Sequence, residues 1–186
     1  MASESEIRDL VRRVVDEIAP GDDRSAGKSP AAQGVAIGAD HGGFQLKEKL
    51  IAHLRDQGVA VEDCGTSGRD PVDYPDFAHA VASRVAAGTS ECGIVIDGAG
   101  IGSSITANKV PGVRAALCYD ISSARNSREH NHANVLTLGA GLIGEGLARQ
   151  IVDTWLETPW GPGRHAKRVE KIGEVERMYL TRTQGS

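Results

Sequence analysis

The chain has 186 residues, enough for one substantial hydrophobic core and too few for two ordinary domains. A formal net charge of -4 gives no reason to expect nucleic acid or an anionic membrane as a partner. Three cysteines without a C-x-x-C pair suggest neither a disulfide framework nor a zinc cluster, so we expect a protein of the reducing cytoplasm.

The N-terminal segment predicts a helix on a linker. Apolar residues recur at helical spacing from Ile7 to Ile18, with charged residues between them, so we expect an amphipathic helix within residues 1–18. No continuous apolar stretch there is long enough for a secretory signal or a membrane span. Residues 19–34 mix Pro and Gly with charged and small residues, which predicts a flexible linker.

From Val35 onward, short apolar runs alternate with longer helical patterns. The sequence predicts strands at 35–39, 59–63, 93–97, 113–118 and 134–138. It predicts helices at 44–57, 76–87, 103–109, 121–130 and 144–156, and a last helix after Gly163. This alternation favours one domain over residues 35–181, followed by a tail at 182–186. We expect a three-layer α/β/α architecture with a doubly wound, five-stranded parallel sheet, in which ligands bind beyond the carboxyl ends of the strands.

Two of the predicted strands run directly into residues that can do chemistry. Asp40 and His41 follow the first strand, and Asp97 ends the third strand before the glycine-rich turn Gly98 to Gly102. The glycines allow the backbone to approach a ligand and to aim N–H groups at developing negative charge. The alternatives are that Asp40 only caps the next helix, and that the turn binds a nucleotide or merely reverses the chain.

Two later segments carry polar and basic groups. The helix after the fourth strand ends in His130 and Asn131, which could be no more than a solvated face. Arg164 and Arg168 stand four residues apart, so on a helix they share a face and could clamp a phosphate. The alternative is a basic helix end that pairs with acidic residues further along the same helix.

Taken together, these segments resemble the family that contains type B ribose-5-phosphate isomerase and the subunits of galactose-6-phosphate isomerase. The resemblance covers roughly Val35 to Glu176. The residues that carry it are Gly38-Ala39-Asp40-His41-Gly42-Gly43, Asp73-Tyr74-Pro75, Gly98-Ala99-Gly100-Ile101-Gly102, Ala107-Asn108-Lys109, Arg128-Glu129-His130-Asn131, and Gly163-Arg164-His165 with Arg168.

The resemblance implies a Rossmann-like fold and an aldose–ketose isomerase that works through an enediolate without a metal or other cofactor. It also implies a homodimer, or a tetramer, with active sites shared between subunits. His130, helped by Asp40, would open the furanose ring. The remaining roles are substrate binding: the backbone at Gly98, Gly100 and Gly102 for the enediolate oxygens, Asn131 and Tyr74 for the sugar, and His41, Arg164 and Arg168 for the phosphate, with both arginines from the partner.

Three departures from the family pattern bear on the chemistry. Asp97 stands where the best-known members carry a cysteine base, and Ser103 stands where another branch carries a glutamate base. We therefore hypothesise that Asp97 abstracts the C2 proton, in a site where it converges with the Gly turn and His130 on one open-chain sugar. Ala99 replaces a common loop hydroxyl, and Gly141 replaces a phosphate-binding arginine.

The sequence therefore predicts an isomerase that converts ribose 5-phosphate to ribulose 5-phosphate. The alternatives are an isomerase of a six-carbon aldose phosphate and a non-catalytic sugar-phosphate-binding protein. The N-terminal helix and linker resemble encapsulation peptides, which direct enzymes into bacterial microcompartments. We expect residues 1–18 to contact a shell or its cargo in that lumen, although the helix could also dock on its own core or dimerise. No nucleic acid or membrane partner is expected.

Overall fold

The structure, a computed structural model, describes residues 34–183. The helix expected within residues 1–18, nearly all of the expected linker and the last three residues of the tail lie outside this range. Within it, five strands alternate with six helices, in the order β1 (Val35–Ala39), α2 (Phe44–Asp56), β2 (Val61–Asp63), α3 (Tyr74–Ala86), β3 (Cys92–Asp97), α4 (Ile101–Ala107), β4 (Ala115–Leu117), α5 (Ile121–Asn131), β5 (Val135–Gly139), α6 (Glu145–Glu157) and α7 (Arg164–Thr183).

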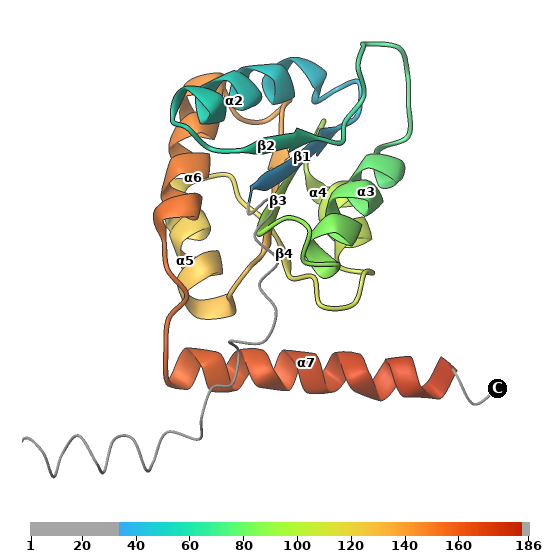
Figure 1. The fold of residues 1–186 in the computed structure, drawn as a ribbon, viewed down its shortest axis with the longest axis vertical. Coiled ribbons are helices and arrows are strands. Elements are labelled where there is room, and N and C mark those ends of the chain that lie inside the picture. Colours follow the sequence, from blue (N-terminus) through green and yellow to red (C-terminus); the bar gives the residue numbers. More distant parts are fainter. Residues whose placement is uncertain (1–33, 184–186) are drawn as a thin grey trace, which may run out of the picture. The chain divides into compact units, whose positions relative to one another are not determined.

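The sheet has the strand order β2-β1-β3-β5-β4, and every pair is parallel. Figure 1 shows α2, α5 and α6 on one side of it and α3 and α4 on the other. Side chains alternate between its two faces: Ile37 of β1 joins a core with α2, α5 and α6, whereas Ala36 joins a second core with α3 and α4. The predicted three-layer, doubly wound parallel sheet is therefore confirmed.

The boundaries differ from the prediction mainly at the outer strands. β2 and β4 each have one neighbour and pair over three residues, so both are shorter than expected. α3 begins earlier than predicted because Pro75 fits the first helical turn, where a proline costs no hydrogen bond. α4 begins earlier because Gly100 adopts the left-handed conformation, with φ 76°, and the helix starts at Ile101.

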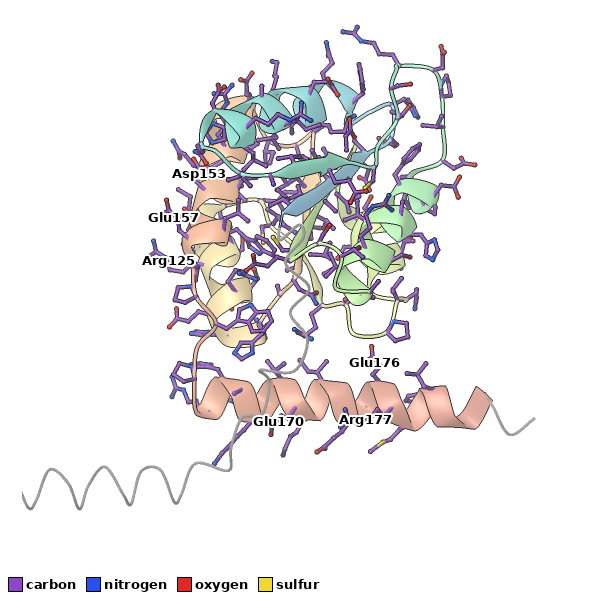
Figure 2. The ribbon with its side chains drawn as sticks, in the orientation of Figure 1. Arg125, Asp153, Glu157, Glu170, Glu176 and Arg177 are labelled. Carbon is purple, nitrogen blue, oxygen red and sulfur yellow. The ribbon has the colours of Figure 1, made fainter. Side chains whose placement is uncertain are left out.

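The sheet has two ends of different character. At the carboxyl edge, where the strands end, lie the turns after Ala39, Asp97 and Gly139. At the amino edge, where the strands begin, lies α7: the carboxylate of Glu176 accepts hydrogen bonds of 3.0 and 3.1 Å from the N–H of Gly112, shortly before β4. Figure 2 shows Glu176 on the side of α7 that faces the sheet. None of the helices within residues 34–183 is long and apolar enough to cross a membrane.

Candidate functional site

Asp40 and His41 leave β1 at the carboxyl edge. Asp40 is buried, and its Oδ1 accepts a 3.0 Å hydrogen bond from the N–H of Gly43, just before α2. Its Oδ2 accepts no hydrogen bond from residues 34–183 and is not among their fully buried unpartnered atoms, so it faces solvent. Asp40 therefore supports the start of a helix and still offers a carboxylate oxygen to a ligand.

His41 and Tyr74 are positioned around the turn by the backbone. Nδ1 of His41 lies 3.2 Å from both the N and the O of Val72, so the imidazole is tied to the loop that precedes α3. The ring of Tyr74 covers Gly102, where an added Cβ would lie 2.5 Å from the ring carbons. The structure thus brings these two expected substrate-binding residues to the same edge as Asp40.

Asp97 is buried and organises the Gly turn. Its Oδ1 accepts hydrogen bonds from the N–H groups of Ala99, at 2.7 Å, and Gly100. Its Oδ2 accepts from the N–H and the hydroxyl of Ser103, at 3.0 and 2.5 Å. These four bonds occupy the roughly four lone-pair positions of a carboxylate. To accept a C2 proton, Asp97 must give up at least one of them.

The same bonds narrow the expected oxyanion site. The N–H of Gly100 was expected to face the enediolate, but it is directed at Asp97 instead. Ile101 and Gly102 occupy the first two positions of α4, where N–H groups have no acceptor within the helix. The N–H groups of Ile101 and Gly102 therefore remain as donors for a substrate oxygen, whereas that of Gly100 is already used by Asp97.

Tyr119 was missed from the sequence. Its hydroxyl donates a 2.6 Å hydrogen bond to the carbonyl oxygen of Ala99 and so holds the Gly turn from the side of β4. Its position in the sequence could have indicated this role, because it lies two residues after β4, which ends at the carboxyl edge. Ser103, considered only as the site of an absent glutamate, also holds this turn through Asp97.

The other expected site residues gather where α5 ends and α7 begins. The rings of His130 and His165 stack with centroids 4.1 Å apart and planes inclined by 1°. Nδ1 of His130 lies 2.8 Å from the amide nitrogen of Asn126. Nε of Arg164 lies 3.4 Å from Nε2 of His165. Asn131 and Arg168 belong to the same two helix ends.

This second group lies at the amino edge, so Asp97 and His130 of the same chain do not converge, and the expected convergence would require a second copy. α5 crosses over from β4 to β5, which are parallel, so it must run back toward the amino edge. Asp97 pairs with Gly139 at the end of β5, whereas His130 precedes the start of β5 at Val135. Four strand residues at about 3.3 Å each separate the two levels by about 13 Å.

We call Asp40, His41, Tyr74, Asp97 and the Gly98–Gly102 turn the carboxyl-edge half-site. His130, Asn131, Arg164 and Arg168 form the amino-edge half-site. Each half-site is assembled within one chain, and neither contains the full set expected around one sugar.

Gly141 lies against the carboxyl-edge half-site. Its N–H donates a 2.9 Å hydrogen bond to the carbonyl oxygen of Gly98, and an added Cβ would lie 2.9 Å from that same oxygen. The position expected to carry an arginine is thus closed to any side chain unless the Gly turn moves.

Comparison with known proteins gives a consistent result. The model of a family described as Ribose/Galactose Isomerase matches residues 35–172. Ribose-5-phosphate isomerase B of Escherichia coli is 47% identical over 142 residues, which cover 76% of this chain and 95% of that protein. Ribose-5-phosphate isomerase B of Mycobacterium tuberculosis H37Rv is 41% identical over 147 residues, 78% of this chain and 91% of that protein.

Solved structures agree with these relatives. Ribose-5-phosphate isomerase B of Clostridium thermocellum superimposes with a TM-score of 0.78 at 52% identity, over 80% of this chain and 99% of that one. The enzyme of Mycoplasma genitalium, solved with bound ribulose-5-phosphate, gives a TM-score of 0.75 at 37% identity, over 77% of this chain and 96% of that one.

Proposed function

The chain belongs to the ribose/galactose isomerase family, and on this premise we propose that it converts ribose 5-phosphate to ribulose 5-phosphate. The observation that carries the proposal is the match to ribose-5-phosphate isomerase B over 95% of the E. coli protein at 47% identity. In this reaction a base removes the C2 proton of the open-chain aldose to give an enediolate, the hydroxyl proton on the C2 oxygen passes to the C1 oxygen, and a proton returns to C1. No net oxidation or reduction occurs.

We propose that the working site is composite, with the carboxyl-edge half-site of one chain facing the amino-edge half-site of a second copy. Asp40 and the Gly turn would then meet His130 and Asn131 of the partner, as well as the two arginines expected from it. Exposed apolar side chains beside the Gly turn support the proposal that a second copy covers this surface: Ile101 and Ile105 on α4 are 52% and 58% exposed. On α7, Ile172 and Val175 are also exposed.

The role of Asp97 as C2 base stays a prediction. It is supported by the position of Asp97 at the carboxyl edge, next to the proposed oxyanion donors of α4. Its four hydrogen bonds mean that a bound sugar would have to displace one donor, and the hydroxyl of Ser103 is the one that can rotate away. Asp40, with one oxygen facing solvent, would assist ring opening with the partner's imidazole.

Turnover on a panel of five- and six-carbon aldose phosphates tests the substrate, and proton exchange at C2 in deuterated water tests the chemistry. We expect ribose 5-phosphate to give the highest kcat/KM and to exchange its C2 proton. A higher kcat/KM for a six-carbon sugar would replace the substrate assignment. Binding without any exchange would identify a sugar-phosphate-binding protein and refute the enzymatic proposal.

We also propose that residues 1–18 direct the enzyme to a microcompartment lumen. The family match begins at residue 35, so the segment lies outside the part shared with the family. Residues 1–34 fused to a fluorescent reporter should give puncta in cells that make shells, whereas diffuse cytoplasmic fluorescence would count against targeting. Removing the segment should leave turnover nearly unchanged, since every proposed site residue lies beyond it.

A further inference from the structure

The ring of His165 stacks on that of His130, but the proposed mechanism gives a role only to His130. The two rings are parallel to within 1°, with centroids 4.1 Å apart, and they come from different helices. His165 therefore limits how far the His130 ring can turn about its side-chain bonds. The amide of Asn126, 2.8 Å from Nδ1, restrains the same ring at its edge.

The polar contacts of His165 fit a neutral ring. Nε of Arg164 always carries a proton and donates it, so Nε2 of His165, 3.4 Å away, must keep its lone pair. The proton of the neutral ring is then on Nδ1, which is buried and has no acceptor among the described residues. A second proton would place two donors against each other at Nε2 and would break the contact with Arg164.

The charges around His165 act in the same direction. The groups that face it are His130 and Glu129 on α5, and Arg164 and Arg168 on α7. Partial burial of the imidazole, and then the positive charges of His130 and Arg164, lower the pKa of His165 from its ordinary value, while Glu129 opposes them. His165 is therefore neutral above the ordinary histidine pKa and becomes protonated only as the pH falls through its lowered pKa.

We propose that neutral His165 is a positioning residue that joins the two functions of the amino-edge half-site. Its ring face supports His130 for proton transfer at the sugar ring, and its Nε2 orients Arg164 for the phosphate. Protonation of His165 separates the two groups and disables the half-site at low pH. This inference rests on the proposed roles of His130 and Arg164.

Two substitutions separate the two contacts of His165. His165→Phe keeps a flat ring for the stack but offers Arg164 no acceptor, so KM for ribose 5-phosphate should rise several-fold while kcat stays within about twofold. His165→Gln keeps an acceptor oxygen but no ring, so kcat should fall about tenfold while KM changes little. Both variants should lose the part of the acid-side fall in kcat that comes from the protonation of residue 165.

Nuclear magnetic resonance titration of the imidazole groups in the full chain tests the coupling without relying on turnover. In His130→Phe the ring stack remains but the like charge is gone, so the titration midpoint of His165 should rise. An unchanged midpoint would overturn the coupling. Wild-type kcat, KM and pH profiles in both His165 variants would overturn the positioning role.

The outcomes distinguish this inference from the proposed function. If the wild-type chain does not isomerise ribose 5-phosphate, the proposed function fails, whereas the titration still decides whether the charge of His130 affects the protonation of His165. If the wild-type chain turns over and the His165 variants behave like it, the function stands and the role of His165 is refuted.

Discussion

Asp97 is the residue on which the geometry of the Gly turn depends most directly. Its carboxylate ties the backbone of Ala99 and Gly100 to the start of α4 through Ser103. Preorganised donors of this kind stabilise charge that develops in a transition state because they need not reorient during the reaction. Asp97 thus has a structural role whether or not it also takes the C2 proton.

Replacing Asp97 by Asn should lower kcat by about 100-fold or more. The amide nitrogen would face the N–H of Ser103 or of the turn, where only an acceptor fits, and the proposed base would be lost. Steady-state kinetics on ribose 5-phosphate measures the effect. Ser103→Ala is the matched control: it removes the hydroxyl bond alone and should cost about tenfold at most. An Asp97→Asn variant with wild-type kcat would exclude both roles.

Gly141 gives a second prediction at this scale. Gly141→Ala should lower kcat/KM several-fold, because the new Cβ would meet the carbonyl oxygen of Gly98 at 2.9 Å and push the Gly turn away. The control is Gly146→Ala in α6, where nothing lies within 4 Å of the added Cβ and kinetics should not change. If Gly141→Ala is as active as the control, the turn is not held at this contact.

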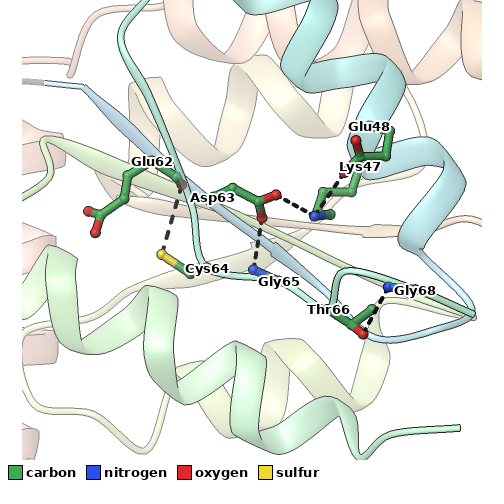
Figure 3. Close-up of polar contacts among 8 residues, drawn as sticks. All are labelled: Lys47, Glu48, Glu62, Asp63, Cys64, Gly65, Thr66 and Gly68. Carbon is green, nitrogen blue, oxygen red and sulfur yellow. Dashed lines mark hydrogen bonds and ion pairs between the residues drawn. The ribbon is translucent and has the colours of Figure 1, made fainter. Parts of the chain in front are cut away.

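Among the elements, α2 and β2 are joined by an ion pair with a buried lysine. Figure 3 shows Nζ of Lys47 between two carboxylates, at 2.5 Å from Asp63 and 2.9 Å from Glu48. The Lys47 side chain is 1% exposed, so its charge depends on these partners for solvation. Asp63 also accepts a 2.9 Å bond from the N–H of Gly65, which starts the loop toward His41 and Tyr74.

Asp63→Asn should destabilise the fold by about 1 to 3 kcal/mol, because the half-exposed carboxylate of Glu48 would be the one negative charge left beside buried Lys47. Glu48→Gln removes a partner that is itself half exposed and should cost less than about 1 kcal/mol. Equilibrium unfolding in urea measures both. Equal free energies of unfolding for the two variants would show that the pair with Asp63 is not the one that stabilises buried Lys47.

The elements also show what the sequence could and could not predict. The order of strands and helices followed from apolar periodicity, because each crossover buries one helical stripe against the sheet. The outer strands β2 and β4 were predicted too long, since an edge strand ends where its single neighbour stops pairing. The hydrogen bonds of Asp97 were not predictable, because they depend on the orientation of its side chain within its own turn. The bond of Tyr119 was not predictable either, because it joins the segments that follow two separate strands.

The position of His130 could have been predicted from topology alone. A helix that connects two parallel strands returns the chain to the amino edge, so residues at its end cannot lie at the carboxyl edge of the same chain. The motif pattern grouped these residues around one sugar without taking the direction of α5 into account. Arg164 is placed in the amino-edge half-site by its contact with His165, whose ring stacks on that of His130.

At the scale of the whole molecule, the account requires two copies of the chain. Each copy would contribute its carboxyl-edge half-site to one active site and its amino-edge half-site to the other, as two-fold symmetry demands. A single chain would then bind fragments of the substrate without turning it over. Turnover per chain should therefore fall when the protein is diluted below the dissociation constant of the dimer.

The most direct test mixes two inactive variants, Asp97→Asn in the carboxyl-edge half-site and His130→Asn in the amino-edge half-site. After subunit exchange at equal concentrations, about half of the dimers should be mixed, and each mixed dimer should contain one site with no substitution. The account predicts recovery of about one quarter of wild-type kcat per chain. Activity that stays at the level of the separate variants, with mixed dimers demonstrated, would contradict a site built from two chains.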